Sequence, residues 1–418
     1  MATNLDTDLP AAPHEAGLSA SALQQIDSTV HGLIDEGEIS GAVTAVARYG
    51  KVAHLGTYGV ADLDGGTPMR EDTIFRIYSM TKAVGSAGVM VLVEEGQIDL
   101  DAPLSSYLTE LADMQVVVDP AADAASLRFE PAAREMTVRD ALRHTSGLPG
   151  TSRYLASKSA LGDLYRESGM DRLFEHDLKE IVQILGTVPL LYHPGDRWQY
   201  SISADVLGRL IEVVAGVPFD QFLEERIFQP LGMVDTGFFV PPEQRHRLAA
   251  LHGPGEDGRL RTILAPQGGS TYEHAGNFLV KPRFLSNGGG LVSTAADCLR
   301  FCLMLTGGER LGEVRLLQPE TVAEMTRNQL PDSLIPIDKA PAERYDGLGV
   351  GLGVSVRAYQ TDWVPAAQVG EYGWIGGAST EFWIAPQEDL VALVLVQRIP
   401  FSRLSWAVKP HIYAAIER

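Results

Sequence analysis

The chain is organised around residues 75–84, which read Phe75-Arg76-Ile77-Tyr78-Ser79-Met80-Thr81-Lys82-Ala83-Val84. The run that follows, from Gly85 to Glu95, is rich in Val, Ala and Met, which predicts a buried helix. Ser79 and Lys82 are three residues apart, so on a helix they share one face. If Ser79 lies at the helix start, its oxygen feels the positive end of the helix dipole, which favours an alkoxide-like nucleophile.

A serine hydroxyl is a weak nucleophile until a neighbouring base activates it. Lys82 is the nearest candidate, because burial or a cationic or phenolic neighbour can favour the neutral form of a lysine. Ser79 and Lys82 form the only S-x-x-K pattern in the chain. A helix-capping serine followed by a solvated lysine gives the same pattern, so the motif needs support from elsewhere in the sequence.

Composition describes an ordinary globular enzyme, with 45% hydrophobic and 21% charged residues. The 418 residues carry a net charge of -20, and no basic cluster is visible, which argues against nucleic acid or an anionic membrane as partner. The segment from Met1 to Leu18 lacks a signal-peptide pattern, and no apolar run reaches membrane-spanning length. We therefore expect a soluble, cytoplasmic protein, with its oligomeric state left open.

The two cysteines, Cys298 and Cys302, lie four residues apart in a helical pattern. Two cysteines at this spacing do not form a disulfide framework, and we expect them to be reduced core residues. They belong to no metal-ligand cluster, so no metal is predicted, and the chemistry described below needs no organic cofactor.

Strand patterns gather at both ends of the chain and helical patterns in the middle. Expected strands are 41–48, 52–60, 347–356, 367–372, 380–384 and 390–396. Expected helices include 19–35, 137–143, 203–214, 219–228, 295–305, 318–325 and 402–417, while 119–135 and 241–284 read as loops. This order predicts an α+β fold in which one antiparallel sheet, built from both chain ends, is flanked by helices and joined to a mainly helical region.

The expected division is a loose leader at 1–17, an α/β domain from 18–90 and 285–418, and a mainly helical domain at 91–284. An active site is expected in the cleft between the two domains.

Several further motifs follow the S-x-x-K pattern in order: His144-Thr145-Ser146-Gly147-Leu148, Tyr200-Ser201-Ile202, Gly288 to Asp297, and Trp374-Ile375-Gly376-Gly377. Together with Ser79 and Lys82 they resemble the class C β-lactamase-like serine hydrolases, over about residues 18–415. The resemblance implies that Ser79 is the nucleophile and that Lys82 and Tyr200 share the general base and acid work. It also implies an oxyanion hole made by the backbone N–H groups of Ser79 and Gly377.

Two departures from the lactamase pattern bear on the substrate. The lactamase Tyr motif ends in Asn where this chain has Ile202, and their Lys-Thr-Gly motif is replaced by Trp374-Ile375-Gly376. Both changes remove polar handles, so we expect Trp374, Ile202, Ile375 and Gly376 to line an apolar pocket. This pattern is similar to the family VIII carboxylesterases, which are β-lactamase-like in fold and hydrolyse short-chain esters. The expected partner is a small-molecule ester.

Other readings stay open at this point. The same three residues serve β-lactamases, D-amino-acid peptidases and other amide hydrolases, and acyltransferases, and a non-catalytic binding protein is the least favoured reading. The chain has no G-x-S-x-G pentapeptide, and none of its ten histidines stands in a recognisable triad context. We expect His144 to be structural, whereas His193 and His252 are candidates for lining the cleft.

Overall fold

The computed structural model describes residues 11–150, 158–263, 278–307, 314–335, 337, 346–362 and 366–417. Its centre is an eight-stranded sheet in the order β10-β11-β12-β13-β14-β1-β2-β3, in which every neighbouring pair is antiparallel. The strands are β1 (Gly41–Arg48), β2 (Lys51–Asp62), β3 (Thr67–Pro68), β10 (Leu348–Val350), β11 (Ser355–Arg357), β12 (Tyr372–Gly376), β13 (Thr380–Ala385) and β14 (Leu390–Leu395). The α+β fold predicted from the sequence is confirmed.

Strand β1 joins the two ends of the chain, because it pairs with β2 on one side and with β14 on the other. All eight of its residues are buried, since helices cover both faces of the sheet. Val43 and Ala45 face the main core, whereas Ala42 and Val46 face a second core on the opposite side. This alternation follows from the two-residue period of a strand.

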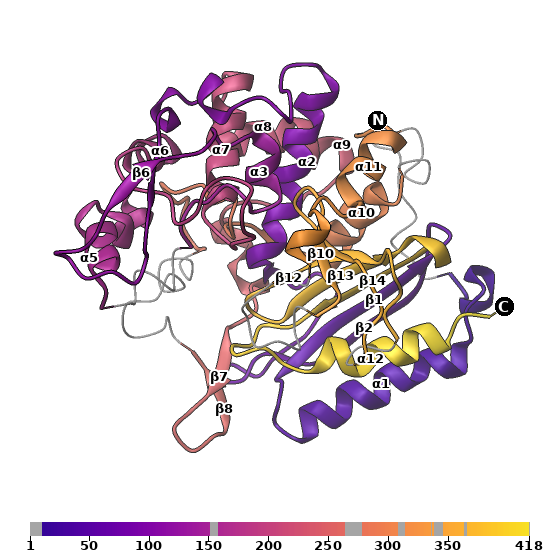
Figure 1. Cartoon of the computed structure of the whole chain (residues 1–418). Helices are drawn as coiled ribbons and strands as arrows, with labels where there is room; N and C mark the ends of the chain where they lie inside the picture. Colours follow the sequence, from indigo (N-terminus) through magenta and orange to yellow (C-terminus); the bar gives the residue numbers. More distant parts are fainter. Residues whose placement is uncertain are drawn as a thin grey trace.

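The second core is closed by two helices that lie side by side on the outer face of the sheet, α1 (Ala20–Asp35) and α12 (Leu404–Ala414) (Figure 1). Ser19 caps α1 by accepting a hydrogen bond from the Ala22 N–H. Part of the expected loose leader is ordered here: Pro13–Ala16 form a 3-10 helix, and Ala16 is fully buried. Residues 1–10 of that leader lie outside the described residues.

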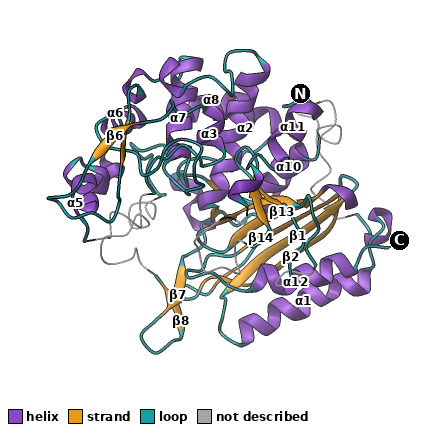
Figure 2. Cartoon of the chain, in the orientation of Figure 1, coloured by secondary structure: helices purple, strands orange, loops and turns teal. Residues whose placement is uncertain are grey.

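Helices cover the other face of the sheet and continue into the helical region (Figure 2). They are α2 (Thr81–Glu94), α3 (Val138–Leu142), α5 (Ala160–Glu167), α6 (Leu178–Leu185), α7 (Ser203–Ala215), α8 (Phe219–Leu223), α9 (Gln229–Leu231), α10 (Ala295–Leu305) and α11 (Pro319–Thr326). Every residue of α2 from Thr81 to Leu92 is buried, as expected for a helix that is apolar on all sides. No helix in the described part of the chain is long and apolar enough to cross a membrane.

Three short strand pairs hold the loops that surround the sheet. They are β4 (Phe75–Arg76) with β9 (Val292–Ser293), β5 (Gln115–Val117) with β6 (Phe129–Pro131), and β7 (His252–Pro254) with β8 (Leu260–Thr262). Strand β6 and the pair β7–β8 fall in the segments 119–135 and 241–284, which were expected to be loops throughout. Residues 264–277 of the second segment lie outside the described residues.

Two strand boundaries differ from the expectation. The strand predicted at 367–372 begins only at Tyr372, because a turn with Gly370 at φ 86° precedes it. The strand predicted at 347–356 is divided into β10 and β11 by a turn in which Gly353 has φ 84°. We still propose the two-part division, with residues 18–90 and 285–418 around the sheet and 91–284 as the helical part.

Candidate active site

Ser79 lies in the 3-10 turn Tyr78–Met80, which leads directly into α2. The segment before it is fixed by the pairing of β4 with β9, and Tyr78 takes a left-handed conformation with φ 42°. Such a conformation is uncommon for a residue other than glycine, and tertiary packing must hold it. The backbone therefore presents Ser79 at the helix entrance, while Lys82 sits one turn in, at a buried position.

Ser79, Lys82 and Tyr200 come together in space. The Tyr200 hydroxyl donates a hydrogen bond to Ser79 Oγ at 2.8 Å, and Lys82 Nζ donates to the same oxygen at 3.3 Å. Lys82 Nζ also lies over the Tyr200 ring, 4.7 Å from its centroid, where the ring face attracts a cation. One hydroxyl oxygen is thus within reach of two groups that can exchange its proton.

Lys82 is held from its other side by a glycine-rich loop. Its ammonium group donates a hydrogen bond to the backbone carbonyl of Gly288. The side chain is only 5% exposed, so few other partners are open to it. The lysine therefore has a fixed direction, which points its nitrogen at Ser79.

An aromatic wall surrounds the Tyr200 ring. Trp374 stacks on it with ring centroids 6.1 Å apart, and Trp198 lies at 6.3 Å. His144 lies 4.9 Å from Tyr200 and 6.3 Å from Trp374. These rings fix the plane of the phenol, while the Tyr200 side chain remains 37% exposed.

His144 is nearer to the site than the sequence indicated. It is 3% exposed, and burial together with the charge of Lys82 lowers its pKa to about 3, so the imidazole is neutral. Its Nδ1 lies 3.0 Å from Ser203 Oγ at the start of α7. His144 was expected to be structural. In the structure it is a neutral ring that packs against the ring of Tyr200. No local pattern distinguishes such a histidine, because its neighbours come from distant segments.

The end of β12 packs against the backbone that precedes Ser79. A Cβ on Gly376 would lie 2.3 Å from the Ile77 carbonyl oxygen, so only glycine fits there. Thr380 Oγ1 also donates to that carbonyl, at 3.3 Å. Gly377 follows at the turn and is partly exposed, as is Ile375. The two backbone segments expected to form the oxyanion hole are therefore neighbours.

Three residues that were expected to line the pocket or the cleft have other surroundings. Ile202 is 2% exposed and belongs to the main core. His252 is buried between Ser40 Oγ and the Gln397 carbonyl, and His193 pairs with Glu130 at the surface. Trp374, at 8% exposure, remains beside Tyr200.

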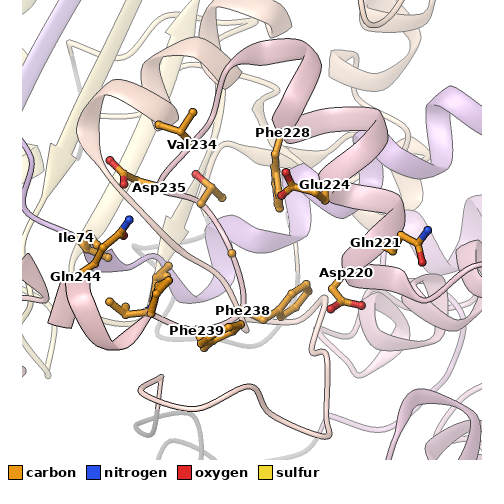
Figure 3. A pocket seen from close by; sticks show the side chains of 15 residues that line it. Ile74, Asp220, Gln221, Glu224, Phe228, Val234, Asp235, Phe238, Phe239 and Gln244 are labelled. Carbon is orange, nitrogen blue, oxygen red and sulfur yellow. The ribbon is translucent and has the colours of Figure 1, made fainter.

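A cavity of about 320 Å³ opens elsewhere, lined by α8, the π-helix Glu224–Phe228 that follows it and the segment 234–244 (Figure 3). Phe228, Phe238 and Glu224 border it, whereas Ser79 and Tyr200 do not. Its acidic groups are partly neutralised, since Asp220 pairs with Lys281 and Asp235 with Arg247. Within the described ranges, no group of three or more His, Cys, Asp or Glu side chains is arranged to hold a metal ion.

Comparisons with known proteins identify similar chains. The family model described as Beta-lactamase matches residues 26–406. An uncharacterized protein of Mycobacterium tuberculosis is 35% identical over 378 residues, 89% of each chain. Esterase EstB of Burkholderia gladioli is 34% identical over 287 residues, which cover 68% of this chain and 69% of the esterase.

Two solved structures share the fold over nearly the whole length. EstCE1, described as a hydrolase with promiscuous acyltransferase activity, has a TM-score of 0.73 at 25% identity and covers 94% of this chain and 99% of its own. Simvastatin synthase LovD from Aspergillus terreus has a TM-score of 0.78 at 24% identity, with coverages of 95% and 99%. The second likeness concerns the fold alone.

Proposed function

This chain belongs to the beta-lactamase family and is a serine hydrolase of that fold, and we propose that it is a carboxylesterase acting on short-chain esters. One observation carries the proposal: the Ser79 hydroxyl accepts hydrogen bonds from both Tyr200 and Lys82. A serine with two adjacent proton-exchanging groups suits the formation of an acyl-enzyme.

In the proposed reaction, Tyr200 reacts as a phenolate beside the Lys82 ammonium. Ser79 Oγ attacks the ester carbonyl carbon while its proton passes to the phenolate oxygen of Tyr200. The carbonyl oxygen becomes an oxyanion, for which the N–H groups of Ser79 and Gly377 are the proposed donors. The carbon–alkoxide bond then breaks, the alcohol leaves with the proton from the Tyr200–Lys82 pair, and Ser79 carries the acyl group. Water, deprotonated by the same pair, releases the carboxylic acid and restores Ser79.

The surroundings of Tyr200 support esters over lactams. Trp374 occupies the place of the lactamase lysine that holds a carboxylate, and it contributes an apolar ring. Ile202 occupies the place of the lactamase asparagine and is buried, so it offers no amide to a lactam side chain. The 34% identity to an esterase agrees with this preference.

The test compares initial rates on p-nitrophenyl butyrate and on a chromogenic cephalosporin, with Ser79→Ala as control. We expect fast ester cleavage that disappears in Ser79→Ala, with slow or absent lactam opening. Lactam opening at a comparable rate would move the assignment to the lactamase branch. If the wild-type enzyme showed no Ser79-dependent turnover of either substrate, the esterase proposal would be wrong.

Acyl transfer is a second candidate, because the similar protein EstCE1 is a hydrolase with promiscuous acyltransferase activity. Tyr200 is partly exposed, and once the first alcohol has left with its proton, the Tyr200 phenolate can take the proton of a second alcohol in place of water. Adding an alcohol in excess to the ester assay and measuring the transesterified product tests this activity. Product that forms only with intact Ser79 supports it.

A further inference from the structure

Asp205 supports the loop that holds Lys82. It is the third residue of α7, and its Oδ1 accepts hydrogen bonds from the Gly288 N–H and from Ser286 Oγ, both at 2.8 Å. Asn287, between these two residues, donates its side-chain amide to the Ala204 carbonyl at 2.8 Å. The start of α7 thus fixes the same loop whose Gly288 carbonyl binds Lys82.

Asp205 also supplies a charge. Its side chain is almost completely buried, and burial raises its pKa, while the Gly288 N–H and the positive charge of Lys82 oppose that rise. A buried carboxylate is retained where hydrogen bonds and an opposite charge compensate for its lost hydration. Among the described residues, Tyr200 and the neutral His144 also interact with Lys82.

We propose that Asp205 is a positioning residue of the active site: through the Gly288 loop it fixes the direction of Lys82, and its negative charge attracts the Lys82 ammonium. This inference rests on the proposed role of Lys82 but not on any particular ester. It also divides the work within the pair: Lys82 acts as the charged partner, and the Tyr200 phenolate is the group that takes the Ser79 proton.

The test is Asp205→Asn, which keeps an oxygen that can accept the two hydrogen bonds but removes the charge. The readout is the rate at which a fluorophosphonate probe labels Ser79, measured from pH 6 to pH 10. We expect labelling to slow by about tenfold. This factor is smaller than the full contribution of general acid–base catalysis, because Tyr200 and Lys82 are both still present. We also expect the pH profile of labelling to differ from that of the wild type, because a negative charge beside the reacting groups is removed.

Asp297 provides a matched control. It too is the third residue of a helix, is 1% exposed, and accepts hydrogen bonds from a backbone N–H (Asp235) and a hydroxyl (Thr236), both at 2.8 Å. Asp297→Asn should change thermal stability but leave both the labelling rate and its pH profile unchanged. A merely structural role for Asp205 would make the two variants behave alike.

Three outcomes overturn the inference: wild-type labelling by Asp205→Asn, an equal loss in Asp297→Asn, or a slower rate with an unmoved pH profile. If Asp205→Asn does not fold, Ser286→Ala is the milder variant, because it removes only one of the two hydrogen bonds that Asp205 accepts. Labelling that is several-fold slower in Ser286→Ala supports the inference. An unchanged labelling rate contradicts it. A wild-type chain that is not labelled at Ser79 overturns the proposed function as well, so the two failures are distinguishable.

Discussion

The indole of Trp374 lies face to face with the phenol of Tyr200, with ring planes inclined by 23° and centroids 6.1 Å apart. This contact joins the middle of strand β12 to the segment before α7 and restricts the rotation of the Tyr200 ring. We therefore expect Trp374 to influence the proton transfer proposed for Tyr200.

We predict that Trp374→Ala lowers kcat/KM for p-nitrophenyl butyrate by about tenfold, since a misplaced acid–base group loses part of its contribution. Trp374→Phe should retain most of the activity, because a smaller ring can still stack. Trp406→Ala is the control, since Trp406 lies on α12 on the outer face of the sheet. Full activity in Trp374→Ala would mean that the stacking does not position Tyr200.

Lys82→Ala should abolish ester turnover with the fold intact, and Tyr200→Phe should lower kcat by about two orders of magnitude or more. Circular dichroism and thermal unfolding verify the fold of each variant. Tyr372→Phe is the matched control: its hydroxyl donates to the Leu305 carbonyl at 2.7 Å, so its loss affects stability and not the reaction. An active Lys82→Ala enzyme would refute the assignment.

Gly85→Ala should lower activity by about tenfold or more, because the new methyl group would lie 1.8 Å from Asn287 Oδ1 and displace the Gly288 loop from Lys82. Gly88→Ala, one turn farther along α2, is the comparison. There the methyl group meets the Phe222 ring at 3.1 Å, so we expect a change in melting temperature with activity retained. Equal activities of the two variants would show that the loop tolerates displacement.

The lowered pKa of His144 should make the free energy of unfolding depend on pH. Its pKa is about 3 in the folded chain because of burial, against 6.5 for an exposed histidine, so only the unfolded chain binds this proton between those values. Stability should therefore fall as pH decreases from 6.5 toward 3, by about 1.4 kcal/mol per pH unit from this group.

His144→Asn tests that slope, because asparagine tolerates the left-handed conformation (φ 59°) but does not titrate in this range. Urea unfolding at pH 7.5 and at pH 5.5 should show a smaller difference in the variant than in the wild type. Burial also lowers the pKa of His54 and of His252, so a residual slope should persist. Identical slopes in the two chains would contradict the prediction.

The pattern of the sequence predicted the parts of the site that depend on local periodicity. The three-residue spacing of Ser79 and Lys82 was enough to place them on one face, and the alternation at both chain ends was enough to predict the sheet. Tyr200, 121 residues from Ser79, was identified only through the resemblance of its motif. Spacing along the chain does not reveal which distant segments meet.

The hydrogen bond that holds Lys82 could not be predicted either, and the reason is different. Its hydrogen-bond acceptor is the Gly288 carbonyl, and every residue carries such a group, so no residue type marks it. Similarly, Gly376 was expected to line the substrate pocket, whereas in the structure it lies against the Ile77 carbonyl oxygen. A glycine in the sequence indicates that another group comes close to the backbone at that position, but it does not identify that group.

The position of β1 between β2 and β14 constrains how the protein is made. On the ribosome, β1 and β2 emerge early, but the strand that completes the pairing of β1 follows about 340 residues later. At typical translation speeds this interval lasts on the order of tens of seconds. During that time an apolar strand edge stays open to other chains, and a chaperone that covers it should raise the yield of active enzyme.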